Sequence, residues 1–260
     1  MIKISVSFLF FFSFFITYNF AQINPDDITI IRDQWGVPHV YAKTDAQVAY
    51  GLAWASAEDD FETIQETLLP IRGGLGAVKG VEGAVLDFAA HLIEVNEIVD
   101  ERYEAEISPK FKEILKAYAQ GMNDFAEKYP KEILSKKMFP INGQDVIKGY
   151  TLALTLLSGL PGDLQKVVSG KMEALENRTP MGSNAFAVNS NKTKDGQTYL
   201  AINPHQPLEG PYSWYEAHLV SKEGTNIIGA AFPGTPCILT GANEYLGWTH
   251  TVNYPDKADV

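Results

Sequence analysis

Cysteine is nearly absent from this sequence, since Cys237 is the only one among 260 residues. The chain therefore cannot form a disulfide within itself, whatever the redox compartment. Cys237 lies in the segment FPGTPCIL, where a cysteine usually behaves as a small buried hydrophobe. We favour that interpretation over a catalytic thiol, because no general base can be named beside it.

The sequence also lacks the motifs of several common enzyme classes. It contains no HExxH, no GxxxxGKS/T and no GxSxG, and no GxGxxG precedes a predicted helix. Histidine is scarce, and its five positions show no recognisable metal-ligand spacing: His39, His91, His205, His218 and His250. A zinc enzyme and a nucleotide-dependent enzyme are therefore not supported.

Positive charge is in short supply. The chain has 21 Lys and Arg residues against 32 Asp and Glu residues, and its formal net charge is -11. An acidic surface repels phosphate backbones and anionic lipid, so we expect no nucleic-acid partner and no membrane-surface partner. Hydrophobic residues make up 45% and charged residues 20%, which is typical of a chain that folds around a core.

A long apolar run stands at the N-terminus. Lys3 precedes an almost unbroken apolar segment at residues 4–18, and Ala21 offers a small residue for cleavage. We interpret residues 1–21 as a signal peptide and expect a periplasmic or secreted protein that begins at Gln22. The alternative is a transmembrane anchor, but the run is shorter than the ~20 residues of a spanning helix. No membrane span is expected after signal removal.

A strand hairpin and a long helix are predicted at the start of the mature chain. Residues 28–41 combine β-branched residues with a turn at residues 34–36, which indicates two short strands. Thr44 then begins a helix within residues 45–69, with Gln47 as its capping-box partner. Apolar residues recur there at helical spacing.

Further helices are predicted up to residue 182. The clearest lies at residues 110–129, where the apolar residues form one stripe that is typical of a packing face. Residues 144–176 also indicate a helix, interrupted near Gly159, Pro161 and Gly162. Glycines between residues 73 and 80 indicate a flexible loop. The region 22–182 is thus expected to be mainly helical.

The pattern changes near Pro180 to that of a sheet. Residues 184–190 alternate as a strand does, Asp195-Gly196 is a strong hairpin signal, and residues 197–203 pair naturally with the first strand. Further strands are predicted at residues 213–221, 226–232 and 246–253. Residues 183–260 therefore read as a sheet-rich second region, and the predicted fold class is α+β. Because no closing layer follows the last strand, we expect the sequence to be a fragment of a longer protein.

Ser183 stands at the junction of the two regions, directly after Gly182. A serine hydroxyl becomes a good nucleophile when an adjacent base takes its proton. If the Gly182–Ser183 bond is cut, Ser183 gains such a base in its own α-amine, which titrates at about 7.7 to 8.0 in model compounds. Gly182 lacks a Cβ and tolerates the strained backbone that attack on its carbonyl requires. On spacing alone, a plain turn at Gly-Ser-Asn is the alternative.

Four segments carry a family resemblance: IRDQWGVPHVYA, AYAQGMNDF, MGSNAFAVNSNKTKDGQTYLAINPH and LGWTHTVNYPDKADV. Together they resemble the penicillin acylase family, and within it the acyl-homoserine-lactone and aculeacin acylase branch. The likeness spans residues 28–260 and is most specific from Gly182 to Asp259. One departure is Asp60, where the family usually has Arg.

The resemblance implies a fold and an organisation. The fold is that of an N-terminal-nucleophile hydrolase, an αββα sandwich that is incomplete here. Residues 22–182 would be the mainly helical α-subunit region, whose end can include a spacer peptide. Residues 183–260 would be the truncated start of the sheet-rich β subunit.

The resemblance also implies roles for particular residues. Ser183 matches the nucleophile, and the Gly182–Ser183 bond matches the site of self-cleavage. His205 matches a position that orients the nucleophile and donates to the substrate region. Val252 matches a position whose backbone N–H forms half of an oxyanion hole.

The resemblance suggests a metal ion only in a structural role, not in catalysis. Asp256, the carbonyl of Ala258 and Asp259 match part of a calcium site found in some members of the family. A solvated acidic loop is the alternative interpretation of these residues. No cofactor is required for the chemistry, so calcium would be structural.

The implied activity is that of an amide hydrolase. It would remove the acyl chain from a linear amide, such as an N-acyl-homoserine lactone or a lipopeptide, through an acyl-enzyme at Ser183. Its partners would be a small acyl-amide substrate and the α and β chains cut from one precursor. A penicillin or β-lactam acylase is the first alternative, although His205 and the segment WTHTV favour removal of fatty acyl chains. A non-catalytic exported binding protein that keeps the fold without cleaving is the second.

Overall fold

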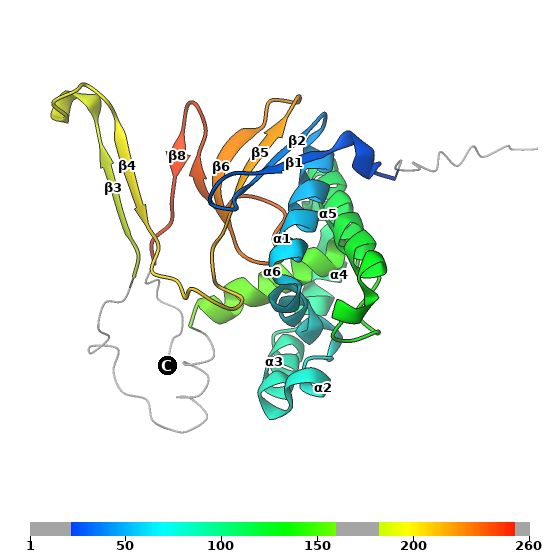
Figure 1. The fold of residues 1–260 in the computed structure, drawn as a ribbon. Helices are drawn as coiled ribbons and strands as arrows, with labels where there is room; N and C mark the ends of the chain where they lie inside the picture. The colour runs from blue at the N-terminus through cyan, green and yellow to red at the C-terminus, as the bar shows by residue number, and fades with distance from the viewer. Residues whose placement is uncertain (1–21, 160–181, 253–260) are drawn as a thin grey trace, which may run out of the picture.

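The computed structural model describes residues 22–159 and 182–252. Figure 1 shows helices gathered on one side of a sheet, with a separate hairpin on the other side. The chain therefore mixes helices and strands, as the α+β prediction requires. The predicted signal peptide and the segment 160–181 lie outside the described ranges.

The elements follow the chain in three groups. The helices are α1 (Asp45–Leu68), α2 (Gly76–Lys79), α3 (Val81–Leu92), α4 (Val95–Glu106), α5 (Pro109–Lys128) and α6 (Gly143–Leu157). Short 3-10 turns are η1 (Pro25–Asp27), η2 (Leu69–Arg72), η3 (Pro130–Glu132) and η5 (Ser190–Lys192). The strands are β1 (Thr29–Arg32), β2 (Pro38–Ala42), β3 (Asn184–Val188), β4 (Tyr199–Asn203), β5 (Tyr215–Ser221), β6 (Asn226–Ala231), β7 (Thr240–Ala242) and β8 (Gly247–Trp248).

The main sheet has the strand order β1-β2-β5-β6-β7-β8. The predicted opening hairpin is confirmed, with β1 and β2 antiparallel and Gly36 at φ 84° in the turn between them. β2 then pairs in parallel with β5, so that His39 lies beside His218. The other pairs in this sheet are antiparallel. The β2–β5 pairing joins the start of the chain to the strands beyond Ser183.

Helix α1 lies against this sheet, and α5 packs on α1. The predicted capping box is present, because Thr44 Oγ1 accepts from Gln47 N and Gln47 Oε1 accepts from Thr44 N. A Cβ at Gly121 of α5 would lie 2.7 Å from the carbonyl oxygen of Tyr50, so glycine allows the two helices to approach closely. The core between helices and sheet contains Val40, Leu52, Ala53, Leu115, Tyr118, Met122 and Leu219.

Asp60 sits at a break within α1. Its φ of -155° and ψ of 68° are not helical, and its Oδ1 accepts a hydrogen bond from Thr63 N at 3.1 Å. The side chain therefore caps the helical segment that follows the break. A short acid suits this local role.

Two predictions of local structure need correction, and one strand is missed. Part of the expected flexible glycine loop is the short helix α2, where a Cβ at Gly76 would lie 3.0 Å from that of Ala84 in α3. The predicted strand at residues 246–253 is reduced to β8, within the part of the chain described. The sequence does not predict β7, because its three residues, Thr-Gly-Ala, have weak strand propensity. Helix α6 ends at Leu157, within the predicted helix 144–176.

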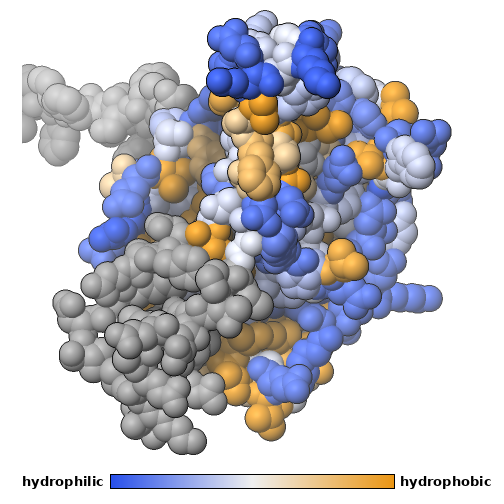
Figure 2. Space-filling model, turned by 90° about the vertical axis from the view of Figure 1, so that its left-hand side faces the viewer, coloured by the Kyte–Doolittle hydropathy of each residue, from blue (hydrophilic) through white to orange (hydrophobic). Residues whose placement is uncertain are grey.

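Strands β3 and β4 form a two-stranded sheet of their own. They are antiparallel, with Asn184 opposite Asn203, and Gly196 has φ 71° in the connecting loop that Asp195-Gly196 predicted. All five residues of β3 are exposed. The hairpin lies beside β8 (Figure 1), where a Cβ at Gly247 would lie 2.6 Å from Leu200 Cδ2. Figure 2 looks onto this side of the molecule and shows hydrophobic patches among polar ones.

Across residues 22–159 and 182–252, no helix is long and apolar enough to cross a bilayer. Within the same ranges, His, Cys, Asp and Glu side chains form no group of three that could hold a metal ion.

Candidate active site

Ser183 is half-buried and directly precedes β3, at the foot of the hairpin. Its Oγ accepts a hydrogen bond from the backbone N–H of His205 at 3.0 Å. The strand register explains this contact. The pair Asn184–Asn203 continues to Ser183 opposite Pro204, which has no N–H, so the amide of His205 is the next donor available.

The imidazole of His205 is held by two amides from the same hairpin. His205 Nε2 lies 3.2 Å from Asn184 Nδ2 and 3.2 Å from Asn203 Nδ2. The ring thus engages asparagine side chains, while the main chain of His205 meets the Ser183 hydroxyl. The sequence pointed to Ser183 and His205 but not to the two asparagines. Extending the predicted strand register by pairing residue 184 with residue 203 would have found them.

Val252 lies beyond the end of β8 and is 47% exposed. The segment before it is tied to Leu239, whose carbonyl oxygen lies 3.0 Å from both Trp248 Nε1 and His250 Nε2. Among the described residues, the structure gives no hydrogen bond between Val252 and Ser183. It thus brings Ser183 and His205 together without linking Val252 to them. Asp256, Ala258 and Asp259 lie outside the described residues.

Cys237 is half-buried, and burial raises the pKa of its thiol. The phenols of Tyr118 and Tyr150 lie near it. A raised pKa disfavours the thiolate, which is the nucleophilic form. The environment therefore suits a packing residue.

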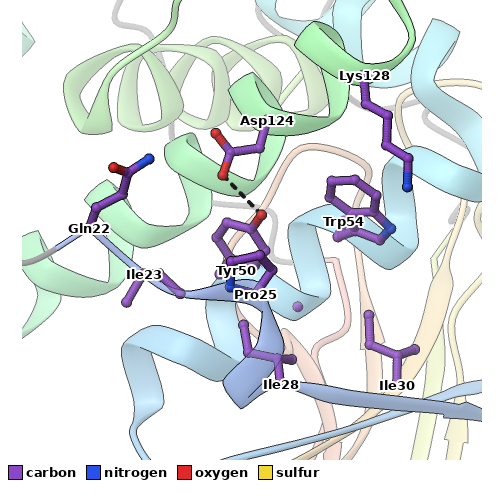
Figure 3. Close-up of a pocket in the computed structure, with 10 residues that line it drawn as sticks. Gln22, Ile23, Pro25, Ile28, Ile30, Tyr50, Trp54, Asp124 and Lys128 are labelled. Carbon is purple, nitrogen blue, oxygen red and sulfur yellow. Dashed lines mark hydrogen bonds between the residues drawn. The ribbon is translucent and has the colours of Figure 1, made fainter.

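A cavity of about 540 Å³ lies between the N-terminal segment, α1 and α5 (Figure 3). Tyr50 donates a hydrogen bond to Asp124 at 2.9 Å, and burial together with this bond raises the pKa of Tyr50. The ammonium of Lys128 lies 4.9 Å above the ring of Trp54. The lining residues come from the N-terminal segment, β1, α1 and α5 and none from the β3–β4 hairpin, so the cavity is separate from Ser183.

Gln120 of α5 binds the N-terminal segment beside this cavity. Gln120 Nε2 donates to the carbonyl oxygen of Ile23, and Gln120 Oε1 accepts from Ile23 N, each at 2.9 Å. Tyr50 and Asp124 form a hydroxyl–carboxylate pair in the cavity's described lining, but the raised pKa of Tyr50 disfavours the nucleophilic phenolate. The Ser183 site is therefore the stronger candidate for chemistry.

Comparison with known proteins gives a consistent group of relatives. Residues 27–260 match the family described as Penicillin amidase. The chain is 27% identical to the acyl-homoserine lactone acylase PvdQ of Pseudomonas fluorescens and 28% identical to that of Pseudomonas putida, each over 90% of this chain and 34% of the relative. It is 21% identical to the Aculeacin-A acylase of Actinoplanes utahensis, over 86% of this chain and 33% of the relative.

The chain spans about a third of the length of these curated relatives. Among solved structures, a thermostable penicillin G acylase from Alcaligenes faecalis is 20% identical, with a TM-score of 0.39 over 59% of this chain and 95% of that chain. A score that low does not establish a common fold. The relationship therefore stands on the sequence match.

Proposed function

The chain belongs to the penicillin amidase family, and from this premise we propose that it is the N-terminal part of an exported acylase that hydrolyses linear amides. The observation that carries the proposal is the hydrogen bond from His205 N to Ser183 Oγ. This bond occupies a lone pair of the hydroxyl oxygen and leaves the hydroxyl proton free to move to a base. No side-chain base is recorded against Ser183 Oγ among the described residues, which suits a base made by cleavage.

Self-cleavage would be the first reaction of the precursor. Ser183 Oγ attacks the carbonyl carbon of Gly182, the bond from that carbon to the nitrogen of Ser183 breaks, and the hydroxyl proton passes to that nitrogen. Water then hydrolyses the resulting ester, which leaves a carboxylate on Gly182 and restores the Ser183 hydroxyl. The products are two chains, the second of which begins with the free α-amine of Ser183.

Acyl transfer would reuse the same hydroxyl. The α-amine takes the Oγ proton as Oγ attacks the substrate carbonyl, and it returns the proton to the leaving amine. Water then releases the acid from the acyl-enzyme. The backbone N–H of Val252 is proposed to contribute half of the oxyanion hole, and one such donor typically accounts for ~10²–10³ in rate.

The substrate class is proposed from the relatives. Two of them are named for acyl-homoserine lactones and one for aculeacin A. A long acyl chain on a linear amide is the shared chemistry, so we place the fatty-acyl amide ahead of a phenylacetyl β-lactam. The alternative of a non-catalytic exported binding protein predicts no cleavage at all.

The remaining proposals concern the whole protein. Removal of residues 1–21 would deliver it to the periplasm or the exterior, and a longer chain would complete the αββα sandwich. Asp256, the carbonyl of Ala258 and Asp259 would help to bind a structural calcium ion. Elemental analysis of the purified full-length protein, before and after mutation of Asp256 and Asp259 to asparagine, tests that site.

The central test compares wild type with Ser183→Ala in the full-length precursor. Mass spectrometry should find wild type cut between Gly182 and Ser183, while Ser183→Ala should remain one uncut and inactive chain. Ser190→Ala, on the loop of the same hairpin, is the matched control and should be cut normally. Processing and amidase activity in Ser183→Ala would place the nucleophile elsewhere.

Substrate preference needs its own measurement. The processed enzyme should hydrolyse a long-chain N-acyl-homoserine lactone with a higher kcat/KM than a phenylacetyl amide. The reverse order would favour the β-lactam acylase. Cleavage of neither, by an uncut chain, would favour the binding protein.

A further inference from the structure

We propose that Asn184 and Asn203 act as a paired-amide clamp on Nε2 of His205, and that this clamp holds the His205 backbone N–H against the Ser183 hydroxyl. The inference rests on the proposed function, because it assigns two positioning residues to the same reaction. It explains the orientation of His205, and it limits which ring nitrogen of His205 can accept a proton.

The strand pairing puts the two amides on one atom. Asn184 and Asn203 are register partners across β3 and β4, so their side chains project from the same face of the hairpin. Each Nδ2 lies 3.2 Å from Nε2 of His205. Two donors that share one lone pair account for distances slightly longer than the usual 2.9 to 3.0 Å.

Packing does not hold this histidine. His205, Asn184 and Asn203 are all exposed, and across the described residues the hydrogen bonds recorded for the His205 ring are those to the two amides. An exposed side chain samples several rotamers unless specific bonds select one. Pro204 stiffens the link between Asn203 and His205, since its ring restricts φ. The clamp therefore orients the ring, and through Pro204 and the main chain it orients the amide that meets Ser183 Oγ.

The clamp also selects a tautomer. An asparagine Nδ2 can only donate, so Nε2 must accept, and in a neutral imidazole the proton then resides on Nδ1. An Nε2 lone pair shared by two N–H groups is not free to take the Ser183 proton. That task falls to another base, as the proposed α-amine requires. The ring can still offer its Nδ1–H as a donor.

The first experiment uses the full-length protein with Asn184→Leu, Asn203→Leu and the double variant. Each single variant leaves one amide in place, so kcat should fall about threefold with KM unchanged. The double variant should lose about 30-fold, more than the product of the two single effects. Asn191→Leu, the same exchange on the loop of this hairpin with no recorded side-chain partner, should keep the wild-type kcat.

Self-cleavage serves as the folding check in the same samples. All four variants retain Ser183 and Gly182, so each should be cut to the same two chains, although more slowly in the double variant. Wild-type kcat in the double variant, or failure of either single variant to be cut, would overturn the clamp. A wild-type protein that neither cleaves nor hydrolyses amides would instead overturn the proposed function, and the clamp with it.

A second experiment separates positioning from a purely structural role. Asn184→Asp keeps size but offers only acceptors, so Nε2 must carry a proton to be bound. The pH profile of kcat should therefore change shape between pH 5 and 8, where imidazoles titrate. Asn184→Leu should lower kcat by the same factor across that range, and Asn191→Asp should change nothing. Identical profiles for Asn184→Asp and wild type would contradict the tautomer assignment.

Discussion

The helical region before the Gly182–Ser183 junction and the hairpin directly after it are held together in different ways. Residues 22–159 supply most of the buried core, including Leu115 and Met122 with no exposed surface. Within residues 182–205, every hydrophobic residue keeps some exposure, and Phe186 is 64% exposed. The core thus lies in one region, whereas the candidate chemistry lies in another whose order comes from strand pairing and side-chain hydrogen bonds.

The strands after the hairpin bind the two regions to each other. His39 and His218 bring their Nδ1 atoms within 2.8 Å, and Tyr215 donates to Asp59 at 2.7 Å. Asp45 accepts hydrogen bonds from Ser221 at 2.6 Å and from Thr225 at 2.7 Å. These contacts cross the junction, so a cut at Gly182 would leave two chains that still share a sheet and a core.

The largest effect on stability is expected from a substitution in the helical core. Leu115→Ala should lower the free energy of unfolding by about 2–5 kcal/mol, because it opens a cavity between α5 and its neighbours. Phe186→Ala on the hairpin should change it by less than about 0.5 kcal/mol. Urea denaturation of residues 22–260 measures both. The same Phe186→Ala exchange can be measured in the full-length protein. If the loss of stability there equals that of Leu115→Ala, residues beyond 260 bury the hairpin.

A second, smaller effect is expected where the two regions meet. Burial alone would raise the pKa of Asp45, but hydrogen bonds from Lys110, Ser221 and Thr225 outweigh it and lower the pKa from 3.8 to about 2. A carboxyl with a lowered folded-state pKa stabilises the fold above its unfolded pKa. Solvent screening reduces the contribution below what the full shift would give, to about 2 kcal/mol, and it is complete above about pH 5 and lost as the pH falls towards 2.

Asp45→Asn tests this link between the regions. The variant should lose about 2 kcal/mol of stability at pH 7 and show a flatter decline in stability between pH 5 and 2. Asp27→Asn, which weakens an exposed ion pair with Lys43, is the control and should cost less than about 1 kcal/mol. Equal costs for the two variants would show that Asp45 does not hold the regions together.

The smallest effect is expected at Cys237. Cys237→Ala should leave kcat of the full-length enzyme within about twofold of wild type, because burial keeps the thiol protonated. A steady-state assay after confirmed processing measures this. A loss of about a thousandfold without unfolding, equal to about 4 kcal/mol of barrier, would move the chemistry from the hairpin serine to this cysteine.

Local signals account for the elements that the sequence predicts well. Thr44 and Gln47 predict the start of α1, and the apolar stripe predicts α5. Asp195-Gly196 predicts the β3–β4 hairpin. Each of these signals lies within a few residues of the element that it specifies. The sequence does not predict the short helix α2 or strand β7. Contacts with other elements, such as Ala84 against Gly76, decide their conformation.

The candidate site divides in the same way. The sequence by itself determined that Ser183 follows a glycine at the start of a strand, since that depends on adjacent residues. Only the tertiary structure decided that Asn184 and Asn203 meet at His205, and that His39 pairs with His218 across 179 positions. The physical reason is register: a strand shifted by one residue turns every side chain to the other face, and long-range pairing alone selects the shift.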